Sequence, residues 1–291
     1  MSAIARRVTA LGAVALLATG CAVAPGASGG SAGGLAPATV APADPDPRAA
    51  FPSAYLTPST GGLRFGPTGS GRLDGRTVVV DPGHNAQWIT SINNVRKPMF
   101  GTAGARCLAV GATGMDGKTM EHTVMWQLSQ KLVPLLRADG ATVLLTRPDD
   151  DGLGPCNDER AEIANRAGAD LLVSLHGDGA ENQKLRGFYA IIPKHSAGGE
   201  ALIAESRAAA EKLITALRQH SEIPSSNYAE NKEMPVQQED FAVLNNLTAT
   251  PGVLLEVANV RQADDWAILT SERGQADLVA GIAAGIVDAL A

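Results

Sequence analysis

From Arg76 to its end, the sequence alternates short apolar runs with longer amphipathic stretches, and this alternation constrains the fold more than any other feature. The apolar runs are rich in Val, Leu and Ile, as strands buried on both faces are; they stand at 77–83, 141–147, 171–179, 187–193 and 251–260. The amphipathic stretches predict helices at 120–140, 157–170, 198–220 and 274–291. Gly140 is expected to close the first helix, and Asn157 or Asp158 to cap the second. The pattern predicts an α/β fold whose mixed, mostly parallel sheet is flanked by helices on both faces.

The region before this alternation has a different composition. Residues 25–72 are rich in Pro, Gly, Ala and Ser and contain few bulky apolar side chains. Such a segment cannot bury enough surface to offset the entropy of ordering it. We therefore expect a flexible segment at 25–72 and a single folded domain at 73–291.

The first residues predict export. Arg6 and Arg7 precede an apolar stretch that is too short to span a bilayer but suits a secretory signal. Two cleavage sites compete, one that would leave Cys21 as a lipoprotein cysteine and one after Ala24. The second is favoured because alanine occupies the position where a lipoprotein signal usually has leucine. We expect a signal peptide at 1–24, no stable membrane insertion after its removal, and a secreted or periplasmic product.

The charge balance argues against one class of partner. The chain has 24 Lys and Arg residues against 30 Asp and Glu, a net charge of -6, and no run of basic residues. Nucleic acid is therefore a poor candidate partner.

Four residues that could carry chemistry stand at the ends of the predicted elements. His84 follows the first apolar run, His176 follows "LLVSL" and Glu256 ends "GVLLE" in two others, and Glu121 begins the first helix. In a parallel sheet, sites lie beyond the carboxyl ends of the strands. Two imidazoles and one carboxylate form a common catalytic zinc set, and the remaining carboxylate would act as general base. Each residue alone has an ordinary structural explanation, but the combination is far more specific than its parts.

Four blocks of the sequence resemble, in order, those of the zinc-dependent N-acetylmuramoyl-L-alanine amidase family: "VVVDPGHN", "EHTVMWQLSQKLVPLLRADGATVLLTR", "RAEIANRAGADLLVSLHGDG" and "PGVLLEVANV". The likeness covers residues 76–291, and the secreted single-domain form is most similar to the mycobacterial cell-wall amidases. It implies that His84, Glu121 and His176 bind zinc and that Glu256 is the catalytic glutamate. It also implies hydrolysis of the amide between N-acetylmuramic acid and the L-alanine of the peptidoglycan stem peptide.

Two other functions remain open at this stage. A zinc peptidase acting within the stem peptide would use the same metal residues, and a peptidoglycan-binding or activator protein could keep the fold without turnover. Family members often have a glycine and an aromatic residue after the catalytic glutamate, where this chain has "VANV". This departure concerns substrate contacts near Asn259. No inserted helix that would block the site is evident, so we expect an open monomer.

The two cysteines of the mature chain predict a disulfide. Cys107 and Cys156 would both lie in an oxidising compartment. Their bridge would close a loop of about fifty residues and contribute roughly 3–4 kcal/mol in the chain-entropy model. It would hold the Gly-rich connection at 87–118 as a wall beside the zinc site; two free thiols are the alternative.

Several nearby residues have open or structural roles. Asp81 either accepts a proton of a ligand imidazole or shapes the turn before His84. Arg147 and Arg160 are expected to form structural ion pairs in preference to binding substrate. Trp88 suits a glycan groove or simple packing equally well. The remaining histidines are assigned no role: His122, His195 and His220.

Overall fold

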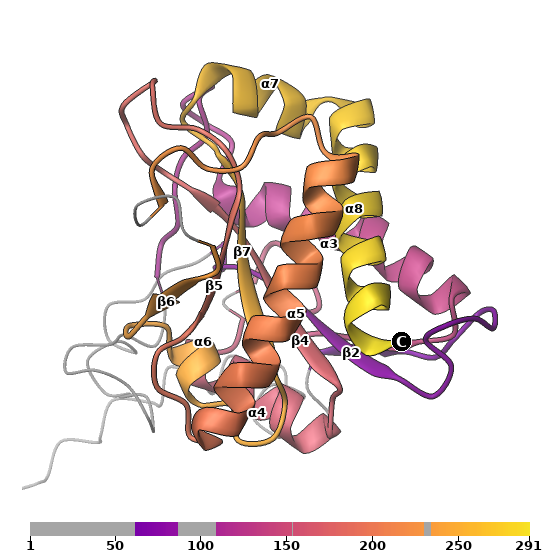
Figure 1. The fold of residues 1–291 in the computed structure, drawn as a ribbon. Helices are drawn as coiled ribbons and strands as arrows, with labels where there is room; N and C mark the ends of the chain where they lie inside the picture. Colours follow the sequence, from indigo (N-terminus) through magenta and orange to yellow (C-terminus); the bar gives the residue numbers. More distant parts are fainter. Residues whose placement is uncertain (1–61, 87–108, 153, 230–233) are drawn as a thin grey trace, which may run out of the picture. The chain divides into compact units, whose positions relative to one another are not determined.

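The structure is a computed structural model that describes residues 62–86, 109–152, 154–229 and 234–291 (Figure 1). Its strands are β1 (Leu63–Phe65), β2 (Thr77–Pro82), β3 (Thr142–Leu145), β4 (Leu171–Asp178), β5 (Tyr189–Pro193), β6 (Val236–Gln238) and β7 (Gly252–Asn259). Its helices are α3 (Glu121–Ala138), α4 (Asn157–Ala167), α5 (Gly199–His220), α6 (Ala242–Asn245), α7 (Ala263–Thr270) and α8 (Glu272–Leu290).

The strands form one sheet in the order β1-β3-β2-β4-β7-β5-β6. The central strands β3, β2, β4 and β7 are parallel to one another, and β6 is parallel to β5. The pairs β1–β3 and β5–β7 are antiparallel. The predicted mixed, mostly parallel sheet is therefore confirmed.

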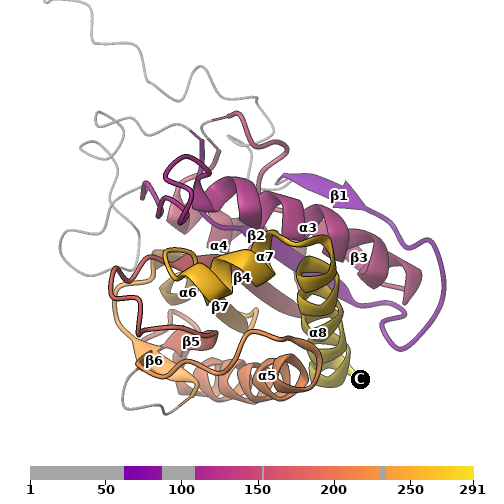
Figure 2. The same ribbon diagram turned by 90° about the horizontal axis from the view of Figure 1, so that it is seen from above.

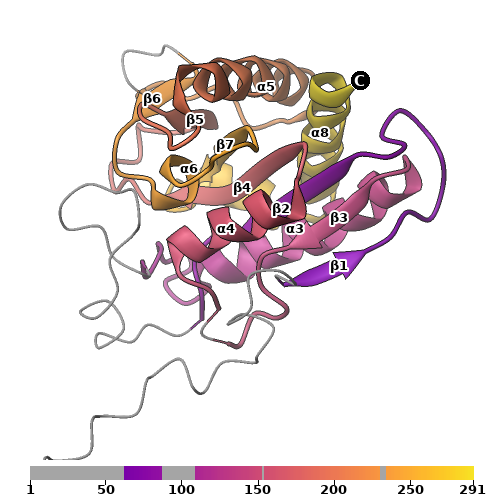
Figure 3. The same cartoon turned by 90° about the horizontal axis from the view of Figure 1, so that it is seen from below.

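Helices cover both faces of this sheet, as the near-continuous apolar strands predict. On β2, Val78 and Val80 pack in a core that contains residues of α3, α5 and α8. Val79 points the other way, into a second core with residues of α4 and α6. Figures 2 and 3 show the sheet between these helices from above and below. Burial on both faces explains why the strands lack a polar side.

The structure corrects the sequence predictions at several points. β1 pairs with β3 although it lies inside the predicted flexible segment 25–72, so the sheet begins before residue 73. Three residues are too few to show the alternation of a strand, and β1 is stabilised by its hydrogen bonds to the edge of β3. The cap of α4 is Cys156, whose N–H donates to the Glu159 carboxylate at 2.9 Å, so capping by Asn157 or Asp158 is wrong by one residue or two. The short elements β6, α6 and α7 were not predicted.

Other predictions concern residues outside the described part of the chain. These are the signal peptide at 1–24, Trp88, and Cys107 of the disulfide with Cys156. In the described part, no helix is long and apolar enough to cross a membrane.

Candidate metal centre and active site

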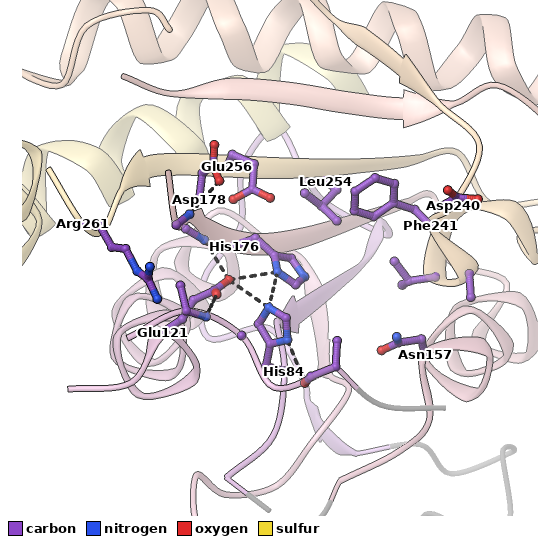
Figure 4. A pocket seen from close by; sticks show the side chains of 17 residues that line it. His84, Glu121, Asn157, His176, Asp178, Asp240, Phe241, Leu254, Glu256 and Arg261 are labelled. Atoms are coloured by element: carbon purple, nitrogen blue, oxygen red, sulfur yellow. Dashed lines mark hydrogen bonds and ion pairs between the residues drawn. The ribbon is translucent and has the colours of Figure 1, made fainter. Parts of the chain in front are cut away.

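A pocket of about 440 Å³ opens at the carboxyl edge of the central strands (Figure 4). All four residues predicted from the sequence line it: His84, Glu121, His176 and Glu256. The edge of β2, β4 and β7 thus brings together side chains that are far apart in the sequence, as expected for a parallel sheet.

His84 reaches the pocket from a strained turn. β2 ends at Pro82, and His84 has a φ of 60°, in the left-handed region that side chains with a Cβ rarely adopt. Its Nδ1 lies 3.0 Å from the carbonyl oxygen of Ala109. A carbonyl can only accept, so Nδ1 carries a proton, and Nε2 can present a lone pair to the pocket when the ring is neutral. Metal-binding histidines are oriented in this way.

A buried ion pair supports this turn and answers the open question about Asp81. Arg160 pairs with Asp81 and also donates to the carbonyl oxygens of Pro82 at 2.9 Å and His84 at 2.8 Å. The Asp81 carboxylate accepts from Ser174 at 2.6 Å and from Thr146. Burial alone would raise the pKa of Asp81, but the charge of Arg160 holds it below its ordinary value. Asp81 therefore acts on the backbone turn through Arg160.

Arg147 is the second buried arginine beneath the site. It pairs with Asp150 at 3.0 Å, donates to the carbonyl oxygens of Pro82 and His122, and lies over the Trp126 ring. Burial, and then the neighbouring Arg160 charge, lowers its pKa to about 10. The prediction of structural ion pairs for both arginines is confirmed.

Glu121 and His176 come from regular elements. Glu121 is the first residue of α3; its Oε2 accepts from the Ala112 N–H at 2.7 Å and its Oε1 from the Gly177 N–H at 2.9 Å. His176 lies within β4, which ends at Asp178, one residue before the end of the apolar run predicted at 171–179. A Cβ on Gly83 would lie 2.5 Å from Nε2 of His176, so only glycine fits beside this ring.

The three predicted ligands meet in a compact cluster. Glu121 Oε1 lies 3.1 Å from both His84 Nε2 and His176 Nδ1, and the two nitrogens are 3.1 Å apart. Tetrahedral zinc with bonds of about 2.0–2.1 Å would separate its ligand atoms by about 3.3 Å. In the metal-free chain a shared proton can hold these atoms together, and a cation between them could replace that proton. The cluster can therefore hold a metal ion, and it is the one such group in the described residues.

The protonation of the cluster fits this interpretation. Burial would raise the pKa of Glu121, but in the metal-free chain the positive charge of His84 and hydrogen bonds from both imidazoles hold it far below its ordinary value, so the carboxylate stays ionised. His122, which follows Glu121, points elsewhere: its Nδ1 contacts Asp150 at 2.7 Å. His122 therefore faces Asp150 and not the cluster.

Glu256 lies within β7, opposite His176 on β4 and Tyr189 on β5. Its Oε2 is buried and has no hydrogen-bond partner in the described part of the chain. Burial, followed by the negative charges of Glu121 and Asp178, raises the pKa of Glu256 well above its ordinary value. A carboxyl group that is dry, unpartnered and basic is suited to accept and return a proton.

The structure adds residues that the sequence predictions missed. Asp178 accepts hydrogen bonds from the hydroxyls of Tyr189, at 3.1 Å, and Tyr228. Burial and the adjacent carboxylates raise the pKa of both tyrosines, which therefore stay neutral donors. Asp178 follows His176 by two residues, and this spacing on a strand could have identified it. The pocket also extends to residues with no sequence signal: Asn157, Asp240, Phe241 and Arg261.

Comparisons with known proteins agree with this site. Residues 78–288 match the family described as N-acetylmuramoyl-L-alanine amidase. An N-acetylmuramoyl-L-alanine amidase of Mycobacterium tuberculosis is 31% identical over 222 residues, which cover 75% of this chain and 88% of that protein.

Solved structures extend the likeness to the fold. The N-acetylmuramyl-L-alanine amidases of Mycobacterium abscessus and Mycobacterium smegmatis match with TM-scores of 0.67 and 0.68 and identities of 33% and 30%. Each match covers 75% of this chain, and it covers 100% and 98% of the respective relative. The chain therefore belongs to the N-acetylmuramoyl-L-alanine amidase family.

Proposed function

We propose that this chain is a zinc-dependent hydrolase that cleaves the amide between N-acetylmuramic acid and the L-alanine of the peptidoglycan stem peptide. One observation carries the proposal: a compact set of three ligand atoms faces the same pocket as an unpartnered, buried carboxyl group. Family membership supplies the class of bond.

His84, Glu121 and His176 would hold the zinc ion. When bound, zinc supplies a Lewis acid that polarises the amide carbonyl and makes water more acidic. The chain contributes the orientation of the ligands: Ala109 fixes the His84 ring, and the N–H groups of Ala112 and Gly177 fix the Glu121 carboxylate.

Glu256 would move the protons of the reaction. Its buried Oε2 has no hydrogen-bond partner in the described residues, which supports a role in taking a proton from the attacking water. An amine leaves an amide only when it is protonated, so the same carboxyl group would pass the proton to the departing alanine nitrogen. The raised pKa of Glu256 favours the protonated form that the second step requires.

The two alternatives differ in their products. A zinc peptidase acting within the stem peptide would release fragments that still carry the muramyl group on alanine, whereas amidase action frees the alanine N-terminus. A silent peptidoglycan-binding protein would cleave neither bond. The retention of Glu256 beside a complete ligand set favours the enzyme, since binding alone does not require that carboxyl group.

The remaining expectations follow from the sequence. We infer that residues 1–24 direct export to the periplasm or cell wall. The segment from residue 25 to the beginning of β1 would then be a flexible tether to the catalytic domain. A Cys107–Cys156 disulfide and a monomeric state belong to the same proposal. The substrate is peptidoglycan, and neither nucleic acid nor stable membrane insertion is part of the proposed function.

Zinc content and product masses test the proposed function. The purified chain is expected to contain about one zinc ion and to release free alanine N-termini from a muramyl peptide, and a chelator should abolish this cleavage. Cleavage between later residues of the stem would instead establish a peptidase. If the chain binds no metal and cleaves no muramyl peptide, the proposed enzymatic function is wrong.

A further inference from the structure

The charges of the pocket are strongly one-sided. Its carboxylates are Glu121, Asp178, Asp240 and Glu256. Among the described residues that line it, Arg261 is the one Lys or Arg side chain. Beyond a bound metal ion, an anionic group of a substrate would therefore meet a favourable charge at Arg261 and repulsion elsewhere.

Arg261 stands in the segment where this chain departs from the usual family pattern. It follows β7, which carries Glu256, and its N–H donates to Asn259 Oδ1 at 3.0 Å. The Asn259 side chain donates in turn to the carbonyl oxygens of Ala180 at 2.9 Å and Leu185 at 2.7 Å. These bonds fix the backbone from which the Arg261 side chain projects.

Arg261 lines the same pocket as the metal cluster. A Cβ built on Gly179, three residues after His176, would lie 3.8 Å from Arg261 Nε. Figure 4 shows the Arg261 side chain on the Glu121 side of the cluster, with Phe241 and Asp240 on the opposite side. The pocket thus has its one described arginine at the end near Glu121 and an aromatic ring at the other end.

The present partner of Arg261 can be replaced. Arg261 Nη1 lies 2.8 Å from Glu181 Oε1, but the side chains are 36% and 85% exposed. Ion pairs at such exposure are weak, and this one engages a single edge of the guanidinium. Arginine can bind a second carboxylate through its other N–H groups, in a two-pronged geometry that lysine cannot reproduce.

The proposed substrate has, in its non-amidated form, a carboxylate at the required position. The stem residue after L-alanine is a glutamate linked through its γ-carboxyl group, so its α-carboxyl group is free or amidated. That group lies within about 7 Å of the scissile amide, which is the span of two residues. We propose that Arg261 binds this α-carboxylate, and that the peptide therefore lies on the Arg261 side of the metal cluster. The muramyl sugar then lies on the side of Phe241 and Asn157.

This inference rests on the proposed amidase function and is tested with two substrates that differ in one group. N-acetylmuramyl-L-alanyl-D-glutamate has the α-carboxylate, and N-acetylmuramyl-L-alanyl-D-isoglutamine has a carboxamide in its place. The zinc-loaded full-length chain is expected to cleave the acid with a kcat/KM about tenfold higher or more. In Arg261→Gln this ratio should fall to about 1, mainly through a higher KM for the acid, because the bound carboxylate takes no part in the bond cleavage.

Two further variants control the comparison. Arg261→Lys keeps the charge and should retain part of the preference for the acid. Arg273→Gln changes the net charge equally at a side chain that is 80% exposed and does not line the pocket, so it should leave the ratio unchanged. Equal kcat/KM for both substrates in the native chain, or an unchanged preference in Arg261→Gln, would overturn the role of Arg261. Cleavage of neither substrate by the native chain would instead count against the proposed function.

Discussion

His84 and His176 bring imidazoles to one cluster from two different kinds of backbone. His176 lies within β4, between the hydrogen-bonded neighbours β2 and β7. His84 lies beyond the end of β2 in a left-handed conformation that disfavours any side chain with a Cβ, by about 1–2 kcal/mol. The sheet itself fixes the His176 imidazole, whereas the His84 imidazole must be held in place by other side chains.

The side chains that hold His84 lose hydration when they are buried, but they fix the backbone of the turn. Arg160 and Asp81 are both almost fully buried, and together they engage the backbone of Pro82 and His84. A buried ion pair seldom increases net stability, but removing one partner leaves the other charge unpaired. We call the part of the site around His84 the turn side, and the part carried by β4 and β7, with His176 and Glu256, the strand side. The comparison predicts that loss of remote side chains lowers stability and zinc affinity on the turn side. On the strand side, substitutions should mainly lower turnover.

The largest effect is expected on the strand side. Glu256→Gln should lower kcat by about 10²- to 10⁴-fold, because the amide cannot accept the proton. Oε2 has no hydrogen-bond partner in the described part of the chain, so zinc content and melting temperature should stay close to those of the native chain. Turnover of a muramyl peptide, with zinc analysis of the same sample, measures this. Native turnover in the variant would remove Glu256 from the mechanism.

On the turn side, Arg160→Ala should destabilise the fold by about 3–5 kcal/mol, because it leaves Asp81 buried and unpaired. Zinc affinity should fall as well, since the His84 carbonyl loses its donor. Urea unfolding of the metal-free chain and chelator competition measure the two effects separately. Arg72→Ala is the matched control: its pair with Asp288 is more than half exposed, and its loss should change stability by at most about 1 kcal/mol. Equal losses in the two variants would contradict the role given to the Asp81–Arg160 pair.

This contrast also explains how much could be predicted from the sequence. His176 and Glu256 are predictable because apolar runs define strands, and parallel strands deliver the residues near their carboxyl ends to one edge. Glu121 is predictable because it begins a clear amphipathic helix. The mixed sheet and both helix layers follow from the same periodicity.

The missing parts depend on tertiary contacts that no local pattern encodes. The left-handed φ of His84 is maintained by Arg160, which is 76 residues away in the sequence. Tyr228 meets Asp178 across 50 residues, from a segment without regular structure. Arg261 is an ordinary charged residue in the sequence and becomes notable only because the other charged side chains in its pocket are acidic.

A smaller effect is expected where a third segment touches the turn side. A Cβ on Gly111 would lie 2.8 Å from His84 Cδ2 and 3.1 Å from Glu121 Oε2, and Gly111 has a φ of 79°. Gly111→Ala should therefore destabilise the chain by about 2–3 kcal/mol and weaken zinc binding. Gly117→Ala is the matched control, with a φ of 72° and nothing within 4 Å, and should cost about 1 kcal/mol with native zinc affinity. Indistinguishable zinc affinities would show that the Gly111 contact does not position the ligands.

The smallest effect is expected at the residue that joins the two sides. Ser174 lies on β4, two residues before His176, and donates to the Asp81 carboxylate at 2.6 Å. Ser174→Ala should cost about 1.5 kcal/mol, the low end for a hydrogen bond to a charged group, because Arg160 and Thr146 still hold Asp81. Ser129→Ala removes an equally buried hydroxyl that bonds only to a carbonyl of its own helix, and it should cost no more than about 0.5 kcal/mol. Urea unfolding of both variants measures the difference, and chelator competition should show native zinc affinity in each. A large loss of zinc affinity in Ser174→Ala alone would mean that the strand holds His84 directly through Asp81, and that the two sides of the cluster are less independent than their backbones indicate.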